Sequence, residues 1–248
     1  MKWLKLLVAG VFLAGSQTSA PAQAKPVQCR VPGYQAERIF PLPQVTKAIA
    51  KKRLVILVVG NGSSVLPGPT GASVSFPARM QVALSKMLPE VDVTVDTDVV
   101  ARRVASDAVK SLPKALGETK PALVVWQTGT VDAMQTIDPD QFSRALDAGI
   151  NISRSAGADV VFVNAQYSPR TESMIALGVY AENMRWVAMQ QEVPLFDRFG
   201  LMRLWSDVGT FDLYSATKKL DMAERVHDCI GMLLADLVIE AARTPSVR

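Results

Sequence analysis

Few residues of this chain have side chains suited to catalysis. Ser63 and Ser64 follow the apolar run Leu54–Val59 after a Gly-Asn-Gly turn. A serine directly after a buried strand can place its hydroxyl in contact with a substrate. A serine nucleophile also needs a base within hydrogen-bond distance. His227 is the single histidine, so any mechanism that needs an imidazole must use it. One His and two Cys exclude zinc clusters of the Cys/His type and iron–sulfur clusters.

The loop that carries the serines is rich in Gly, Ser and Pro. Residues 60–73 lack the lysine of a phosphate-binding loop, and Gly-x-Gly alone is a weak dinucleotide signal. The sequence therefore predicts no cofactor. Serines in such loops also make turns by bonding local backbone, which is the alternative interpretation of Ser63.

The N-terminus has the pattern of an export signal. Lys2 and Lys5 precede the apolar stretch Leu6–Gly15, and Ala22-Gln23-Ala24 forms a small-residue cleavage site. The apolar stretch is too short to span a membrane. We expect a signal peptide at 1–24 and one mature domain at 25–248, periplasmic or secreted, with no stable membrane span after cleavage. The alternative is an uncleaved anchor.

Charge and cysteine content fit an exported protein without a polyanionic partner. The whole chain has a formal charge of +4, and the predicted signal removes two lysines and no acids, so the mature charge falls to about +2. A nucleic-acid partner is therefore not expected. In an oxidising compartment, Cys29 and Cys229 are expected to form a disulfide, the alternative being two buried free thiols.

Apolar strands alternate with helical patterns along the chain. Continuous apolar strands of this kind indicate a mostly parallel sheet covered on both faces, an α/β fold in three α/β/α layers. Ligands of such sheets lie at the carboxyl ends of the strands. The expected strands are 54–59, 91–96, 122–128, 159–165 and 194–197, and the expected helices are 76–88, 99–116 with an interruption at Pro113, 142–156, 171–191 and 224–243.

The order of these segments resembles that of the SGNH/GDSL hydrolases, exported flavodoxin-like esterases. Four segments carry the resemblance, from about Cys29 to the C-terminus: LVILVVGNGSS, FPARMQVALSKMLPEVDV, LVVWQTGTVDA and LDMAERVHDCIG. The resemblance implies a serine nucleophile after the first strand and a Gly after the second. It also implies a Gly-x-Asn after the third strand and an Asp-x-x-His before the last helix.

The resemblance weakens at the catalytic positions. Read without gaps, the nucleophile position falls on Gly62 and the histidine position on Asp221. The second-block Gly has no equivalent in VDTDVVARR, and Gly-x-Asn is replaced by Gly129-Thr130-Val131, which removes an oxyanion donor.

A shifted register restores a candidate site. Ser63 would be the nucleophile and His227 the base, with Glu224 three residues before it, Asp221 as a second acid and Gly129 as an oxyanion donor. The alternative is structural: His227 bonded to a carbonyl or to Asp228, and both acids favouring a helix N-terminus.

Two functions follow. The first is a weak ester hydrolase acting on acyl or acetyl esters of small molecules or glycans. The second is a catalytically inactive binding or accessory protein of the same fold, which could have a protein partner. A metal site of Asp96, Asp98, Asp132 and Asp221 is not expected, because their loops have no recognised Ca²⁺ spacing.

Overall fold

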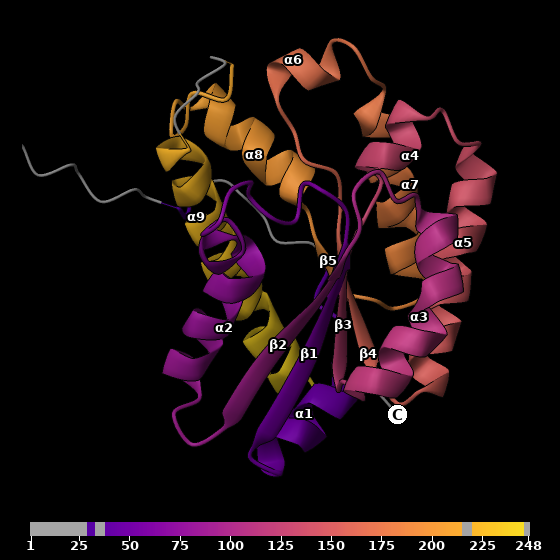
Figure 1. Ribbon diagram of the computed structural model, residues 1–248, viewed down its shortest axis with the longest axis vertical. Helices are drawn as coiled ribbons and strands as arrows, with labels where there is room; N and C mark the ends of the chain where they lie inside the picture. The colour runs from indigo at the N-terminus through magenta and orange to yellow at the C-terminus, as the bar shows by residue number, and fades with distance from the viewer. Residues whose placement is uncertain (1–28, 33–37, 215–219, 246–248) are drawn as a thin grey trace, which may run out of the picture.

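Five parallel strands form the centre of the protein. The computed structural model describes residues 29–32, 38–214 and 220–245 (Figure 1), so the expected signal peptide lies outside the described residues. The strand order is β2-β1-β3-β4-β5, and every neighbouring pair is parallel. The strands are β1 (Arg53–Gly60), β2 (Asp92–Val99), β3 (Leu123–Gln127), β4 (Asp159–Val163) and β5 (Leu195–Phe196).

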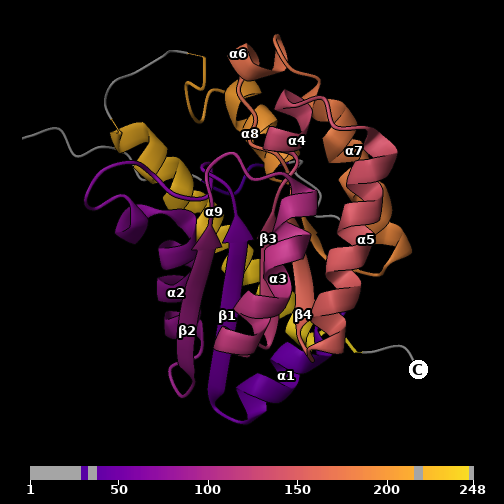
Figure 2. The ribbon, with the colours of Figure 1, turned by 45° about the vertical axis from the view of Figure 1, so that its right-hand side comes forward.

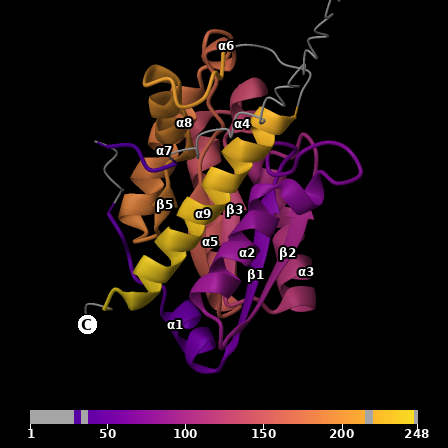
Figure 3. The same ribbon diagram turned by 90° about the vertical axis from the view of Figure 1, so that its left-hand side faces the viewer.

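Helices cover both faces of the sheet and complete the expected three layers (Figures 2 and 3). One face carries α2 (Phe76–Met87) and α9 (Asp221–Arg243), which pack against each other, and the other carries α3 (Ala105–Thr119), α5 (Pro139–Ser155) and α7 (Leu177–Gln190). α1 (Pro43–Ala50) contacts β1 and α9. Short helices are α4 (Thr130–Met134), α6 (Pro169–Glu172), α8 (Arg198–Asp207) and a 3₁₀ turn at Ala72–Val74. Within the described ranges, no helix is long and apolar enough to cross a membrane.

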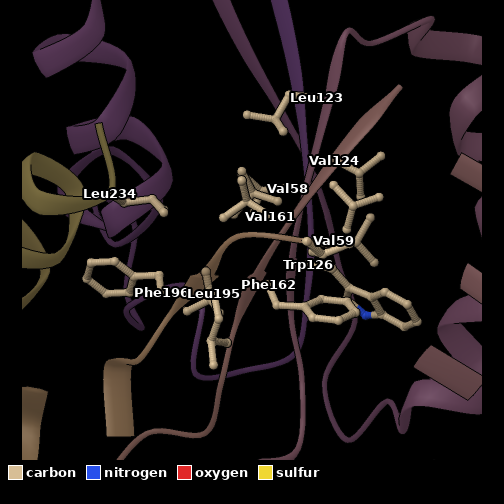
Figure 4. Close-up of a cluster of buried hydrophobic side chains, with 14 of the residues drawn as sticks. Val58, Val59, Leu123, Val124, Trp126, Val161, Phe162, Leu195, Phe196 and Leu234 are labelled. Atoms are coloured by element: carbon tan, nitrogen blue, oxygen red, sulfur yellow. The ribbon is translucent and has the colours of Figure 1, made fainter. Parts of the chain in front are cut away.

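The core explains why the central strands are largely apolar. All five residues of β3 are buried, as is nearly all of β1, because helices cover both faces. Trp126 of β3 packs edge-on against Phe162 of β4 with 5.9 Å between ring centroids (Figure 4). A Cβ added to Gly149 of α5 would lie 2.1 Å from the indole of Trp126, so the glycine lets this helix approach the sheet.

Several predicted boundaries are wrong, and a side chain distant in sequence explains one of them. The helix expected from Val99 begins at Ala105, where the backbone N–H donates to Asp132 Oδ1 over 2.8 Å, and β2 continues to Val99. Pro113 does not interrupt this helix.

The predicted helix over 171–191 is two helices, α6 and α7, and the last helix starts at Asp221 instead of Glu224. α1 was not predicted from the sequence. Its first backbone N–H groups, of Gln44 and Val45, donate to Asp159 Oδ2 at 2.7 and 2.9 Å. Asp159 lies more than a hundred residues from α1 in the sequence, so no local sequence pattern predicts this cap.

Candidate functional site

A cavity of about 350 Å³ opens at the carboxyl ends of the strands. Its walls come from the loop after β1, the loop after β4, the start of α8, the segment after α8 and the first turns of α9. Both Ser63 and His227 line it, so the fold brings the two predicted catalytic residues to one cavity. The lining residues are Gly62, Ser63, Val65, Leu66, Pro67, Gln166, Tyr167, Ser168, Arg198, Met202, Asp212, Leu213, Met222, Ala223, Val226 and His227.

Ser63 is held in a local turn. Its backbone N–H and its hydroxyl both donate to Asn61 Oδ1, each over 3.1 Å, which is the turn bonding expected of serine in such a loop. Ser64 is fully buried and donates to Gln127 Oε1 over 2.7 Å. Ser63 is therefore the serine of this pair that lines the cavity.

The hydrogen bond of His227 fixes which ring nitrogen carries the proton. The Phe76 backbone N–H, at the start of α2, donates to His227 Nδ1 over 2.9 Å. A nitrogen that accepts carries no proton, so the neutral ring is protonated at Nε2. This partner is neither the carboxylate of the catalytic hypothesis nor the carbonyl or Asp228 of the structural alternative.

The surroundings of His227 also oppose its protonation. Its side chain is buried, and its ring lies 5.9 Å from that of Phe76. Burial, and next the positive charge of Arg198, lower the pKa of His227 to about 3. The imidazole therefore stays neutral across the physiological range.

The remaining predicted site residues lie away from the cavity wall. Asp221 and Glu224 stand in the first turn of α9, where carboxylates favour the helix dipole, and neither lines the cavity. The Gly129 N–H donates to Asp132 Oδ2 over 3.2 Å. Asp132 also accepts from Ala105 N–H and Thr128 Oγ1, and burial raises the pKa of its carboxyl. The Asp132 carboxylate is thus bonded to backbone N–H groups at the starts of α3 and α4.

A buried arginine that the sequence analysis did not single out lies in the cavity wall. Arg198, at the start of α8, is 1% exposed. Its Nη1 donates to the Ser63 carbonyl over 3.1 Å and contacts Ser63 Oγ at 3.5 Å, and its Nη2 donates to Gln166 Oε1 over 3.0 Å. The preceding Asp197 caps α8 and pairs with Arg185. Arg198 follows a short strand at the edge where ligands of α/β sheets bind, which is the one sequence signal that could have found it.

A second arginine fills the space where the second and first strands end. Arg103 is buried, pairs with Asp98 Oδ2 over 2.8 Å and donates to the Gly60 carbonyl over 3.0 Å. Asp98 stands in the segment where the resemblance implies a glycine. Among the described residues, no three His, Cys, Asp or Glu side chains are placed to hold a metal ion.

The predicted disulfide is confirmed. Cys29 and Cys229 are joined across a sequence separation of 200 residues. The Cys29 carbonyl also accepts from Trp205 Nε1 over 3.0 Å. The N-terminal segment is therefore fixed to α9 two residues after His227, which holds the start of this helix against the body of the protein.

Several of the solved structures that resemble this chain are named as esterases. The crystal structure of TesA is 23% identical, with a TM-score of 0.55 over 76% of this chain and 98% of that one. The psychrotrophic esterase EstA from Pseudoalteromonas sp. is 15% identical, with a TM-score of 0.58 over 75% and 97%. A catalytic mutant of Axe2, an acetylxylan esterase from Geobacillus stearothermophilus, is 15% identical, with a TM-score of 0.56 over 79% and 96%.

These similarities establish the SGNH hydrolase fold that the sequence resemblance implied. No curated protein matches the chain in sequence. The non-GDSL lipase-like family matches it over residues 28–244, which is nearly all of the expected mature domain. The protein belongs to the non-GDSL lipase-like family.

Proposed function

We propose that this protein is a non-catalytic, ligand-binding member of the SGNH hydrolase fold that acts outside the cytoplasm after removal of residues 1–24. One observation carries the proposal: the Phe76 N–H donates to His227 Nδ1. In a serine hydrolase, the histidine must offer a lone pair to the serine hydroxyl. With Nδ1 already accepting, Nε2 bears the proton and the ring offers the cavity a donor instead.

Moving the His227 proton from Nε2 to Nδ1 would cost free energy. A proton on Nδ1 would leave the buried Phe76 N–H without an acceptor, which typically costs about 1–3 kcal/mol. The pKa of about 3 adds a second obstacle, because a general base works best when its pKa lies near the operating pH. The departures at all four family positions agree with a cavity kept for binding.

Slow ester hydrolysis is the second candidate. It is favoured because Ser63 and His227 line one cavity and because structural neighbours include esterases. In this candidate Ser63 attacks an acyl or acetyl ester, and His227, Glu224, Asp221 and Gly129 keep their predicted roles. The two functions differ in whether an acyl-serine forms.

Fluorophosphonate labelling and 4-nitrophenyl acetate turnover distinguish the two candidates. The wild-type protein is expected to remain unlabelled and to release nitrophenol no faster than its Ser63→Ala and His227→Gln variants. Labelling and turnover that both variants abolish would establish the hydrolase and overturn the binding proposal. A Ser73→Ala variant serves as a matched control, because this exposed serine lies in the same loop outside the cavity wall.

A further inference from the structure

Arg198 is a buried cation without a counter-ion among the described residues. Its guanidinium donates to one carbonyl and one amide oxygen, while its Nε is buried without a partner. It forms no ion pair with a carboxylate of the described chain, although Asp197 precedes it, because Asp197 pairs with Arg185. Burying an unpaired charge costs several kcal/mol, so a neighbouring anion would stabilise this arrangement.

The charge is directed to a cavity and not into the core. Arg198 lines the 350 Å³ cavity, as do the Ser63 hydroxyl and the imidazole of His227, whose Nε2–H is a neutral donor. Burial lowers the pKa of Arg198 to about 9, which leaves the guanidinium charged at neutral pH. The guanidinium and the Nε2–H of His227 therefore present two donor groups and one full positive charge to the same space, as a carboxylate requires, while the Ser63 hydroxyl donates to Asn61 Oδ1.

The acidic side chain that lines the cavity lies at its solvent-exposed rim. Asp212 is the acid that lines the cavity in the described chain, and it is exposed and accepts from the Tyr214 N–H. Its charge is screened by water, whereas that of Arg198 is not. The buried end of the cavity is consequently positive.

The rest of the wall is apolar. Met202 of α8, Leu213, and Met222 and Val226 of α9 contribute hydrocarbon surface to the cavity. Methionine side chains adapt their shape to irregular apolar groups. The volume lies at the small end of the range for small-molecule sites, which suits a ligand of modest length.

We propose that the cavity binds a monocarboxylate with a short hydrocarbon chain, its carboxylate on the Arg198 guanidinium and its chain against Met202, Met222 and Val226. This inference rests on the proposed binding function and names the chemical class of its ligand. A single guanidinium matches one negative charge, which favours a carboxylate over a doubly charged phosphate. The bidentate geometry available to arginine is suited to a planar carboxylate.

Calorimetric titration with hexanoate tests the proposal, with hexanamide as the uncharged isostere and inorganic phosphate as the alternative anion. We expect one hexanoate per chain, bound at least about tenfold more tightly than hexanamide or phosphate, because hydrogen bonds to a charged group are stronger than those between neutral groups. Arg198→Gln is expected to abolish this preference. Arg203→Gln should retain it, because this neighbouring arginine of α8 is exposed and outside the cavity wall.

A second variant covers the case in which Arg198→Gln does not fold. Met222→Trp keeps the guanidinium but fills the cavity, and it is expected to lose hexanoate binding while remaining folded by circular dichroism. Equal affinity for hexanoate and hexanamide, tighter binding of phosphate, binding that survives either variant, or no binding of hexanoate would each overturn the proposal. Those results would leave the absence of Ser63 labelling untouched, so failure of the ligand class is distinguishable from failure of the proposed function.

Discussion

His227 and Arg198 share one cavity, and the positive charge of Arg198 affects the protonation of His227. The lowered pKa of His227 arises first from burial and second from the positive charge of Arg198. A catalytic histidine is normally surrounded in the opposite way, with a carboxylate that stabilises the imidazolium. The neighbours of His227 therefore favour a neutral imidazole that acts as a hydrogen-bond donor.

The pH dependence of stability should reveal this neutral histidine. Below about pH 6.5, the histidine of the unfolded chain takes up a proton, whereas that of the folded chain does so only near pH 3. The unfolded state therefore binds more protons in this window, and the free energy of unfolding falls as the pH is lowered, by about 1.4 kcal/mol per unit from this residue.

Urea unfolding of the wild type and of His227→Gln at pH 7, 6, 5 and 4 measures this effect. Glutamine does not titrate, so the variant should lose less stability than the wild type on acidification. Its other titratable groups are shared with the wild type and cancel in the comparison. Parallel curves for the two proteins would show that His227 is protonated normally in the folded state.

Elements differ in how far their own sequence determines them. The central strands were predictable because Leu54–Val59 and Ala122–Trp126 are continuous apolar runs, and the covered sheet requires such runs. α1 was not predictable, because its first turn is capped by Asp159 of β4.

The contacts of the candidate site also depend on residues that are distant in the sequence. Residue types identified Ser63 and His227, but only the fold shows that Phe76 occupies His227 Nδ1 and that Arg198 is buried between two loops.

The contact between α2 and α9 positions His227 and depends on Gly231. A Cβ at this position would lie 2.5 Å from Arg79 Cβ and 2.8 Å from the Met80 backbone nitrogen of α2. Gly231→Ala should therefore destabilise the protein by about 1–3 kcal/mol through overpacking. Chemical unfolding measures the loss.

Gly117→Ala is the matched control for this prediction. Gly117 lies in α3 with nothing within 4 Å of an added Cβ, so alanine should stabilise the helix by up to about 1 kcal/mol. If both substitutions had the same effect, close approach of α2 and α9 would not be the reason for glycine at position 231.

The disulfide acts on the whole molecule, because Cys29 and Cys229 close a loop of nearly the entire domain. In the chain-entropy model, a separation of 200 residues corresponds to about 5 kcal/mol of stabilisation, and measured values are commonly about 2–5 kcal/mol. The Cys29→Ser/Cys229→Ser double variant should unfold at a correspondingly lower urea concentration.

Reduction of the wild type supplies the control for that variant. Its unfolding midpoint in reducing agent should fall to that of the double variant, while the midpoint of the double variant should not respond to reducing agent. A wild-type midpoint that is unchanged on complete reduction, verified by thiol titration, would contradict a stabilising role for the disulfide.

The central claim is that the cavity of this hydrolase fold presents a hydrogen-bond donor where catalysis needs a base. Long-range ¹H–¹⁵N correlation spectra of the uniformly ¹⁵N-labelled mature protein test it directly, since the chain has a single histidine and a purification tag without histidine keeps the assignment unique. We expect the Nε2–H tautomer, with imidazole chemical shifts that do not change between pH 8 and pH 5. A ring protonated at Nδ1, or one that titrates near pH 7, would contradict it.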